Sequence, residues 1–576
     1  MAVKRQPKVH SGVIAVARRV QGLGRSAIVA VLLMLAACGG SGNSSDGGFS
    51  SQSSAGVSSS SSQSSISVSS SSSSVSSVPA TVNISGTVGF DYVPISKGRG
   101  LNYAATRVKP VRLANVYLID AAGEVVDSSQ TDAAGYYTLQ APVNTQVKVQ
   151  VAAVSESNAA QRWEIRVEDN TMGNALYVLE GQLRSSGTVN SVRDLRAASG
   201  WTGSDYTEPR AAGPFAILDS AYMAVQKLAE VDANLTLPVS IFRWSVNNTT
   251  AEGLLADGDI VTSFYNGEAV YILGQADVDT DEYDAHVVVH EWSHFFEYRV
   301  GQRSNSIGGD HSGLDKLDMR VAYSEGFANG IAGYVLSDPE YQDSFRLGQE
   351  YSAGVDLSRK DVLDAGWYSE TSIQTIFYHL ADSGAFEEIY GVLTDALYTA
   401  VPAFTSIFSF ADIMATRYPA AFPVLDTLMS EQSITGRDQF GAGETNSGGT
   451  NGVLPLYVDL LPDGSETTVC STQINGSYNK LGIHQFLKTT VLSGDNYQLV
   501  VENNGDRIEP TDPDVAGSRN ALQWRGDSGV SDSEVLNLNL QGGTTYAFSV
   551  NDYAEHIDAQ SAGYQPACFN VSLTPQ

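Results

Sequence analysis

The most informative part of the sequence is Val287-Val288-Val289-His290-Glu291-Trp292-Ser293-His294-Phe295-Phe296. Two histidines four positions apart lie on the same face of a helix, so both imidazoles can bind one metal ion. Glu291 lies about 100° round the helix, where it faces a water beside the metal rather than the metal itself. The apolar residues on either side would bury the other faces. The stretch therefore predicts a buried helix that carries a zinc site.

A second helix-compatible stretch follows at Ala322-Tyr323-Ser324-Glu325-Gly326-Phe327-Ala328-Asn329-Gly330. A catalytic zinc ion takes three protein ligands and leaves its fourth position to water, so the two histidines need a partner. The stretch resembles the glutamate helix of gluzincin peptidases, and the resemblance implies that Glu325 is the third ligand. It also implies that Asn329 supports a zinc-binding histidine from the same helical face. Gluzincins of the thermolysin type usually have an aspartate at that second place.

Other residues could supply the third zinc ligand in place of Glu325. The metzincin pattern would need glycine in place of Glu297 and histidine in place of Val300, so that class is excluded. Asp310 and His311, in a glycine-flanked loop, are alternatives for the third ligand. Rigid helices position ligands better than loops do, which favours Glu325. A helix whose histidines are only hydrogen-bonded is the alternative in which no metal binds.

These residues predict a zinc endopeptidase. Zinc lowers the pKa of a coordinated water to about 7 and polarises the scissile carbonyl. Glu291 would act as general base and pass the proton to the leaving amine. The negative tetrahedral intermediate needs a further donor, for which His379 is the candidate and its neighbour Tyr378 the alternative. Two other functions stay open: a non-catalytic surface binding or adhesion lipoprotein on the same scaffold, and a zinc amidase that acts on peptidoglycan.

The N-terminus predicts export. A basic stretch precedes an apolar run and then Leu35-Ala36-Ala37-Cys38-Gly39, which gives residues 1–37 the form of a signal peptide. The ending resembles a bacterial lipobox, which implies cleavage before Cys38 and an anchor in a membrane leaflet through lipid on its thiol. Gly39 resembles the outer-membrane sorting case, with the protein facing the periplasm or the cell surface. The serine-rich residues 38–80 would form a flexible tether.

Charge narrows the choice of partners. The formal net charge is −30, from 34 basic and 64 acidic residues, which argues against nucleic acid as a partner. A protein or peptide is the expected substrate. Four aspartates alternate just before the zinc motif: Asp277, Asp279, Asp281 and Asp284. Their oxygens suit calcium, while capping of the helix N-terminus is the alternative.

Patterning divides the rest of the chain into modules. Residues 81–155 contain alternating β-type runs, and the stretch 131–139 resembles the hairpin of transthyretin-like, carboxypeptidase-regulatory β-sandwiches. Residues 156–440 mix strands and helices. They include a hairpin that turns at Asn266-Gly267, and its second strand, 269–273, is expected to pair with substrate as an edge strand.

The C-terminal part of the chain predicts a second β-sandwich. A glycine-rich linker, 441–453, leads to short strands over residues 454–576. Once Cys38 carries lipid, Cys470 and Cys568 are left as a pair near the two ends of this part. An oxidising compartment would permit a disulfide between its first and last strands, while two buried free thiols are the alternative.

The expected fold is a multidomain chain, with an α+β zincin-like catalytic domain flanked by an N-terminal and a C-terminal β-sandwich. The order of its elements is similar to that of uncharacterised bacterial lipoproteins taken to be gluzincin-like peptidases. That similarity extends over most of residues 82–440. It implies a fold and zinc chemistry, and it names no substrate.

Overall fold

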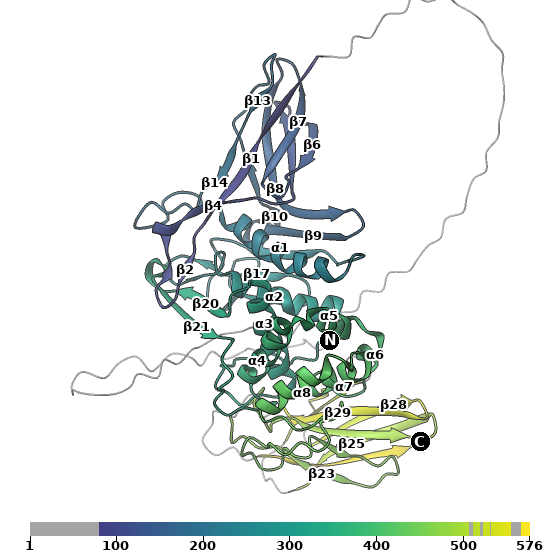
Figure 1. Cartoon of the computed structure of the whole chain (residues 1–576). Coiled ribbons are helices and arrows are strands. Elements are labelled where there is room, and N and C mark those ends of the chain that lie inside the picture. The colour runs from purple at the N-terminus through teal and green to yellow at the C-terminus, as the bar shows by residue number, and fades with distance from the viewer. Residues whose placement is uncertain (1–79, 506–510, 519–521, 530–531, 554–565) are drawn as a thin grey trace, which may run out of the picture. The chain divides into compact units, whose positions relative to one another are not determined.

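The structure is a computed structural model that describes residues 80–505, 511–518, 522–529, 532–553 and 566–576. The expected signal peptide, Cys38 and nearly all of the serine-rich tether lie outside these ranges. The described residues form several β-sheets and a set of helices that lie mainly in the teal and green middle of the chain (Figure 1). None of the described helices has the length and apolar character needed to span a membrane.

The first part of the described chain is mostly β-structure. Along β1 buried and exposed residues alternate over the first half, with Val82 and Ile84 facing inward, as the period of a strand requires. β1 pairs antiparallel with β4 and β7 and parallel with β13 and β14. The strands of this part are β1 (Thr81–Tyr92), β2 (Ile95–Ser96), β3 (Gly100–Leu101), β4 (Arg107–Pro110), β5 (Ala114–Asp120), β6 (Val125–Gln130), β7 (Tyr136–Pro142), β8 (Gln146–Asn158), β9 (Arg162–Asp169), β10 (Ala175–Leu176), β11 (Val178–Glu180), β12 (Arg184–Ser185), β13 (Ser191–Val192) and β14 (Leu195–Ala197), with short helical turns η1 (Tyr103–Ala105) and η2 (Asn170–Met172).

One sheet of ten strands continues across the position where the sequence placed a module boundary. Its path is β16-β17-β15-β9-β8-β5-β6, and β8 itself runs through residues 155 and 156. The two segments are linked by β8 itself, which pairs antiparallel with β9 beyond the boundary. The sheet then continues to β15 (Ser240–Trp244) by a parallel pairing in which Ile165 lies opposite Ser240. A parallel partner some seventy-five residues away leaves no local trace in the sequence, so patterning alone could not predict this extension of the sheet.

The hairpin at Asn266-Gly267 is present, but its expected edge strand is not at an edge. The turn is closed by the amide of Asn266, which donates to the carbonyl of Ala269 at 3.2 Å, and Gly267 takes φ 91°. It joins β16 (Phe264–Tyr265) to β17 (Val270–Ile272). Because β17 also pairs in parallel with β15, it lies inside the sheet. The end of the sheet path is β16, so the prediction of 269–273 as an edge strand was wrong.

The middle of the chain contains most of the helices. The helical elements are α1 (Gly213–Val231), α2 (Ala285–Phe295), η3 (Phe296–Val300), α3 (Met319–Leu336), η4 (Leu347–Gln349), α4 (Glu370–Leu380), η5 (Ala381–Ala385), α5 (Phe386–Thr394), α6 (Ala396–Ala400), α7 (Ile407–Arg417) and α8 (Phe422–Glu431). A four-stranded sheet lies beside them in the order β18 (Gly274–Gln275), β19 (Asp279–Thr280), β20 (Glu340–Phe345) and β21 (Tyr351–Asp356). The helix predicted around the zinc motif is α2, and the glutamate stretch is part of α3.

Helices α3 and α4 pack closely because two glycines of α3 face α4. A Cβ at Gly326 would lie 2.5 Å from the Cβ of Ile373, and one at Gly330 would lie 2.8 Å from the Cβ of Phe377. Both distances are too short for real side-chain contacts, so only glycine permits this approach. The two positions are one turn apart on α3 and flank Asn329, which fixes where the polar residues of α3 meet those of α4.

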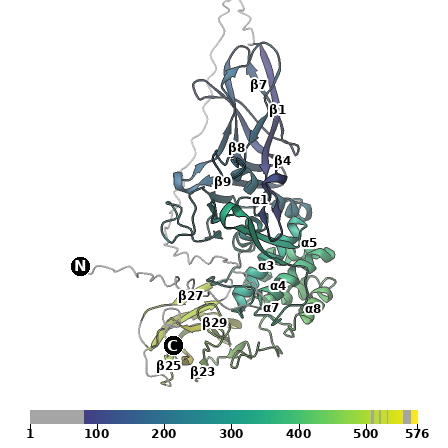
Figure 2. The same ribbon diagram turned by 90° about the vertical axis from the view of Figure 1, so that its left-hand side faces the viewer.

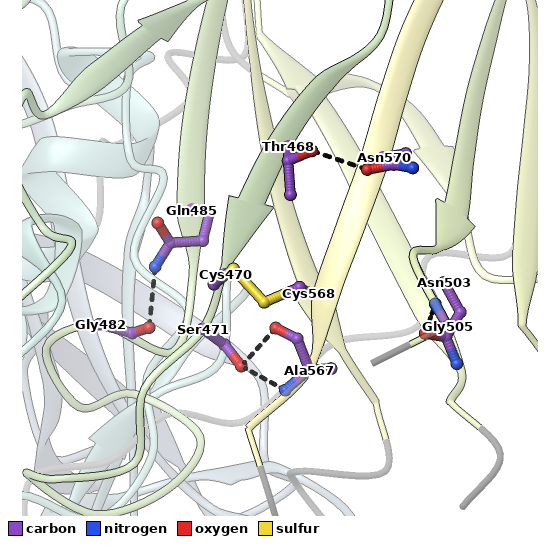
Figure 3. Close-up of a disulfide and its surroundings, with 10 residues drawn as sticks. All are labelled: Thr468, Cys470, Ser471, Gly482, Gln485, Asn503, Gly505, Ala567, Cys568 and Asn570. Atoms are coloured by element: carbon purple, nitrogen blue, oxygen red, sulfur yellow. Dashed lines mark hydrogen bonds between the residues drawn. A yellow bond between two sulfur atoms is a disulfide. The ribbon is translucent and has the colours of Figure 1, made fainter. Parts of the chain in front are cut away.

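The C-terminal strands form two sheets that share one apolar core (Figure 1 and Figure 2). The sheets run β22-β24-β29-β26-β27 and β23-β30-β25-β28. Cys470 and Cys568 lie directly opposite one another on β23 and β30 and are joined by a disulfide (Figure 3). The strands are β22 (Tyr457–Asp459), β23 (Thr467–Cys470), β24 (Gln485–Val491), β25 (Asp495–Asn503), β26 (Pro513–Ser518), β27 (Leu522–Gly526), β28 (Ser533–Leu540), β29 (Thr544–Asp552) and β30 (Cys568–Pro575).

Candidate metal centre

Helix α2 brings the two motif histidines to one point. The Nε2 atoms of His290 and His294 are 3.1 Å apart. The valines before the motif and Trp292 and Phe295 within it are buried, so the helix is packed on its other faces. A four-residue spacing on a helix produces this approach of the two rings without help from the rest of the chain.

Helix α3 adds a carboxylate to the pair. Oε2 of Glu325 lies 3.2 Å from Nε2 of His290 and 3.2 Å from Nε2 of His294. Three ligands of a tetrahedral zinc ion at bond lengths near 2.05 Å would be separated from one another by about 3.3 Å. The three donor atoms of this His–His–Glu cluster (His290, His294 and Glu325) therefore have the separations that one zinc ion requires, and the structure brings together the expected ligand set.

Hydrogen bonds on the far side of each ring decide which nitrogen carries the proton. Nδ1 of His290 lies 2.8 Å from Oδ1 of Asn329, an atom that can only accept. Nδ1 of His294 lies 3.2 Å from Oγ of Ser324, whose single proton is donated to Glu297 at 2.7 Å. Both rings thus carry their proton on Nδ1, which leaves a lone pair on each Nε2.

Three electron pairs consequently face one point inside the protein. Oε2 of Glu325 is buried and has no hydrogen-bond donor among the described residues. Burial opposes ionisation of this carboxyl, but positive charge on the His294 and His311 imidazoles outweighs burial and holds its pKa well below the usual range; a metal ion would supply that charge in place of the Nε2 proton of His294. A carboxylate and two lone pairs at 3.2 Å repel one another unless a cation lies between them. The cluster therefore fits a zinc ion by its donor atoms, its spacing and its charge.

Asparagine at position 329 has a physical reason. Its Nδ2 donates to Oε1 of Glu370 at 2.7 Å and to Oε1 of Gln374 at 3.1 Å, while its Oδ1 accepts from His290. An amide can do both, whereas an aspartate would place a second carboxylate against Glu370. The departure from the thermolysin-type pattern is thus matched by a carboxylate on α4 that sequence reasoning did not single out.

Glu291 stands beside the cluster without joining it. Its Oε1 is 4.0 Å from Nε2 of His290, and its Oε2 is buried with no hydrogen-bond partner in the described part of the chain. Burial raises the pKa of this carboxyl to about 8, although the neighbouring His290 opposes the shift. A buried carboxyl that accepts a proton readily, next to a cluster that can hold a metal ion, has the properties of a general base.

His311 also reaches the cluster, from the loop before α3. Its Nε2 is 3.7 Å from Oε2 of Glu325 and 3.5 Å from Oε2 of Glu370. This nitrogen has no hydrogen-bond partner among the described residues. Burial lowers the pKa of this imidazole, but Glu325 and then Glu370 outweigh burial and raise it. Asp310, the other alternative ligand from the sequence, is exposed.

The loop that carries His311 is held by a distant segment. The side chain of Asn479 donates to the carbonyl of Gly308 at 2.8 Å, and Nζ of Lys480 donates to the carbonyl of Asp310 at 2.6 Å. These donors lie about 170 residues further along the chain. Because side chains from outside the loop bind its backbone, the loop positions His311 more firmly than its glycines suggest.

His379 lies at the end of α4 and has other contacts. Its Nε2 is 2.9 Å from the carbonyl of Ser358, and its ring lies beside Tyr378. Tyr378 itself packs against the small apolar cluster of Val287, Tyr341 and Leu357. Neither residue has a recorded contact with the His–His–Glu cluster within the described ranges, whereas His311 does.

The expected calcium-binding aspartates are divided by the structure. Asp279 and Asp281 face Asp343 of β20 in a second group that can hold a metal ion. Asp277 instead accepts from the amide of Gly348 at 2.8 Å, and Asp284 is engaged by Ser344. The expected set of four aspartates is therefore corrected to Asp279, Asp281 and Asp343. Pairing of β19 with β20 brings in Asp343, which is distant in sequence, while Asp277 and Asp284 have other partners.

Comparisons with known proteins leave the chain without a family. No family model and no curated protein matches it. Among solved structures, the pre-peptidase C-terminal domain of a collagenase from Bacillus anthracis has 14% sequence identity over 20% of this chain and 95% of its own length, with a TM-score of 0.14. CorA, a surface-associated copper-binding protein of Methylomicrobium album BG8, has 8% identity over 21% of this chain and 98% of its own, with a TM-score of 0.16. Similarities at such TM-scores carry no argument about this chain.

Proposed function

We propose that this protein is an exported zinc endopeptidase of the gluzincin type, with a zincin-like catalytic region built around α2, α3 and α4. The observation that carries the proposal is the His–His–Glu cluster, in which two Nε2 lone pairs and one carboxylate oxygen converge at 3.1 to 3.2 Å. His290, His294 and Glu325 would hold the ion. When bound, zinc supplies Lewis-acid activation of the scissile carbonyl and of the attacking water.

Glu291 is the proposed general base. Its unpartnered Oε2 would take the proton from the attacking water and pass it to the nitrogen of the leaving amine. The raised pKa of this buried carboxyl, about 8, supports the second transfer, because the protonated form is an effective acid near neutral pH. No other residue of the motif has a free carboxylate oxygen beside the cluster, as far as the described residues go.

His311 is a better candidate than His379 for the donor to the negative intermediate. The raised pKa of His311 favours its protonated form, in which Nε2 is a donor, and that nitrogen is buried beside Glu325. A positioned donor of this kind is worth about 10²–10³ in kcat in other hydrolases. A substrate in extended form could add to the free edge of β16, whose neighbour along the sheet is β17.

Export remains part of the proposal on the strength of the N-terminal sequence. The lipobox-like ending would carry lipid on Cys38 and hold the protein at the outer membrane, on its periplasmic or outer side. The disulfide between Cys470 and Cys568 supports an oxidising compartment. Substitution of Cys38 by serine should abolish incorporation of labelled palmitate and release the protein from the membrane fraction. Unchanged labelling would contradict the proposal.

Metal content and cleavage of an unstructured protein test the enzyme. The chain purified without residues 1–37 should contain about one zinc ion, as a single catalytic site requires, and should cleave casein. Glu291→Gln should keep the zinc and lose the activity, while Glu325→Ala should lose the zinc. His286→Gln is a matched control, because His286 lies on the same helix but bonds the carbonyl of Asp338 at 2.9 Å. Full zinc retention in Glu325→Ala would refute the ligand assignment.

The same assay separates the two alternatives. A zinc amidase would leave casein intact and release peptides from peptidoglycan, with the same dependence on Glu291. A non-catalytic binding lipoprotein would hold zinc and cleave neither substrate.

A further inference from the structure

A second cluster of acidic residues, one buried and two half-buried, lies beside the N-terminus of α2. In the antiparallel pair formed by β19 and β20, Asp279 lies opposite Phe345. Asp281 directly follows the end of β19, and Asp343 lies two residues before Phe345 on β20. Since side chains alternate between the two faces of a strand, Asp279 and Asp281 point to the same side. One ligand oxygen of each of the three aspartates lies within 4.8 Å of the others.

The oxygens of this three-aspartate cluster (Asp279, Asp281 and Asp343) lack partners. Oδ1 of each residue is buried without a hydrogen-bond partner in the described part of the chain, and Asp281 is only 3% exposed. The hydroxyl of Ser263 donates to the other oxygen of Asp281. Arg210, a buried cation that contacts Thr280, is occupied by Glu282 and by the carbonyl of Gly274. Within the described ranges no lysine or arginine forms an ion pair with the three aspartates, so the cluster has an excess of negative charge.

Burial of three carboxylates without counter-charge is costly. Burial, with repulsion from the neighbouring aspartates, raises the pKa of Asp279 and of Asp281 well above the usual range, and burial raises that of Asp343 to about 6. Such a group either retains protons or binds a cation. Ion binding and proton retention have different dependences on calcium and on pH, so experiment can distinguish them.

We propose that Asp279, Asp281 and Asp343 bind one calcium ion. Calcium coordinates oxygen at 2.3–2.6 Å, so ligand oxygens in one site can be separated by up to about 4.8 Å. Magnesium keeps most of its waters and is seldom held by a set of protein carboxylates alone. An all-carboxylate set also differs from the nitrogen-rich cluster that suits zinc. Carbonyl groups and water would complete the shell of six to eight oxygens.

The ion would fix β20 against the start of the motif helix. Ser344, next to Asp343, donates to Asp284 through its amide at 2.6 Å and through its hydroxyl at 3.0 Å, and Asp284 directly precedes α2. Tyr341 of the same strand packs on the rings of His286 and His290. Calcium would therefore support the geometry of α2 from a site separate from the His–His–Glu cluster, and its binding does not depend on peptidase activity.

Calcium binding and thermal unfolding of the whole exported chain test this site. The protein is freed of metals, supplied with one equivalent of zinc, and examined with and without added calcium chloride. We expect about one bound calcium ion per chain and a higher midpoint of unfolding. At a calcium concentration one hundred times the Kd, the unfolding equilibrium should move about 100-fold toward the folded state.

Two asparagine variants make the test specific. Asp343→Asn should lose the response to calcium, and without calcium it should unfold at a higher temperature than the parent chain, because it removes one of three repelling charges. Asp277→Asn is the matched control: Asp277 belongs to the same acidic segment but bonds the amide of Gly348, so the response should remain. This reversal of sign distinguishes a calcium ligand from a residue that merely supports the fold.

Three results would overturn the proposal. The first is an unfolding midpoint of the parent chain that calcium does not move while acidification raises it, since the cluster would then hold protons. The second is an Asp343→Asn variant that still responds to calcium. The third is an equal response to magnesium at the same concentration. Loss of casein cleavage has no bearing on these outcomes, so failure of this proposal and failure of the proposed peptidase function are distinguishable.

Discussion

Substitution of Gly330 by alanine tests whether the contact between α3 and α4 positions the metal centre. The added Cβ would lie 2.7 Å from the carbonyl oxygen of Gln374, 2.8 Å from the Cβ of Phe377 and 2.9 Å from the amide nitrogen of Tyr378. These atoms are backbone or Cβ atoms, so no side-chain rotation can relieve the overlap. With carbon–carbon contacts at 3.5–4.0 Å, α3 must move away from α4 by roughly 0.7–1.2 Å.

The expected magnitude follows from two opposing effects. Overpacking of a core costs about 1–3 kcal/mol, while the higher helix propensity of alanine returns about 1 kcal/mol. The free energy of unfolding should therefore fall by about 1 kcal/mol. For a cooperative unit of about 150–250 residues, this lowers the melting temperature by about 2–4 °C. Zinc affinity is more sensitive than stability to this displacement, because α3 carries Glu325 and metal–ligand distances tolerate changes of only about 0.2 Å. We expect zinc affinity to fall at least tenfold.

Chelator competition and thermal melts measure the two effects. Gly333→Ala is the matched control, one turn further along α3, where the Cβ would meet chiefly Cδ1 of Leu357, the end of a side chain that can rotate. That variant gains the same helix propensity and should keep its zinc affinity within about twofold. Equal zinc affinities for the Gly330→Ala and Gly333→Ala variants would refute the reasoning that the helix contact sets the ligand geometry.

Three further substitutions have defined outcomes. Replacing Cys470 and Cys568 by serine removes the bond that closes a loop of 98 residues. On the chain-entropy estimate this bond is worth up to about 4.7 kcal/mol. Calorimetry should show a marked fall in the temperature of one unfolding transition, and an unchanged profile would contradict this. Asn329→Ala should weaken zinc binding about 10–100-fold, because the ring of His290 loses the hydrogen bond that orients it. Chelator competition measures this affinity, and a value equal to that of the parent chain would show that the hydrogen bond is dispensable. Burial raises the pKa of Asp514 to about 7, above its value of about 3.9 in the unfolded chain, so its contribution to stability is lost as pH rises toward 7. Asp514→Asn should therefore raise the melting temperature more at pH 8 than at pH 5, because the loss of stability begins near pH 4 and is complete only near pH 7. Melts that differ equally from the parent at the two pH values would argue against a shifted carboxyl.

The convergence of the two histidines on α2 could be predicted because their geometry is local. A spacing of four residues on a helix places His290 and His294 together whatever surrounds them, and the valines and phenylalanines beside the motif indicate burial. Glu325 could be assigned only through its resemblance to a known helix. Its distance of 3.2 Å from both histidines depends on how α3 packs against α2, and no pattern within either helix determines that packing.

His311 illustrates what the sequence left open. It was one alternative ligand in a glycine-flanked loop, and nothing nearby indicates that the loop is rigid. The side chains that hold its backbone, from Asn479 and Lys480, come from the C-terminal part of the chain. In the same way, Glu370 explains the asparagine at position 329, but the two residues meet only when α4 lies against α3.

The sequence by itself determined the elements whose signals are short in range: the motif helix, the glutamate helix, the turn at Asn266-Gly267 and the alternating strands at both ends. Tertiary structure alone decided the partners. It continued β8 through the expected boundary, joined β9 to the distant β15, moved the sheet edge from β17 to β16, and exchanged Asp277 and Asp284 for Asp343 in the acidic cluster. The physical reason is that helix periodicity and turn conformation are properties of neighbouring residues, whereas strand register and helix contacts arise from the burial of surfaces far apart in the chain.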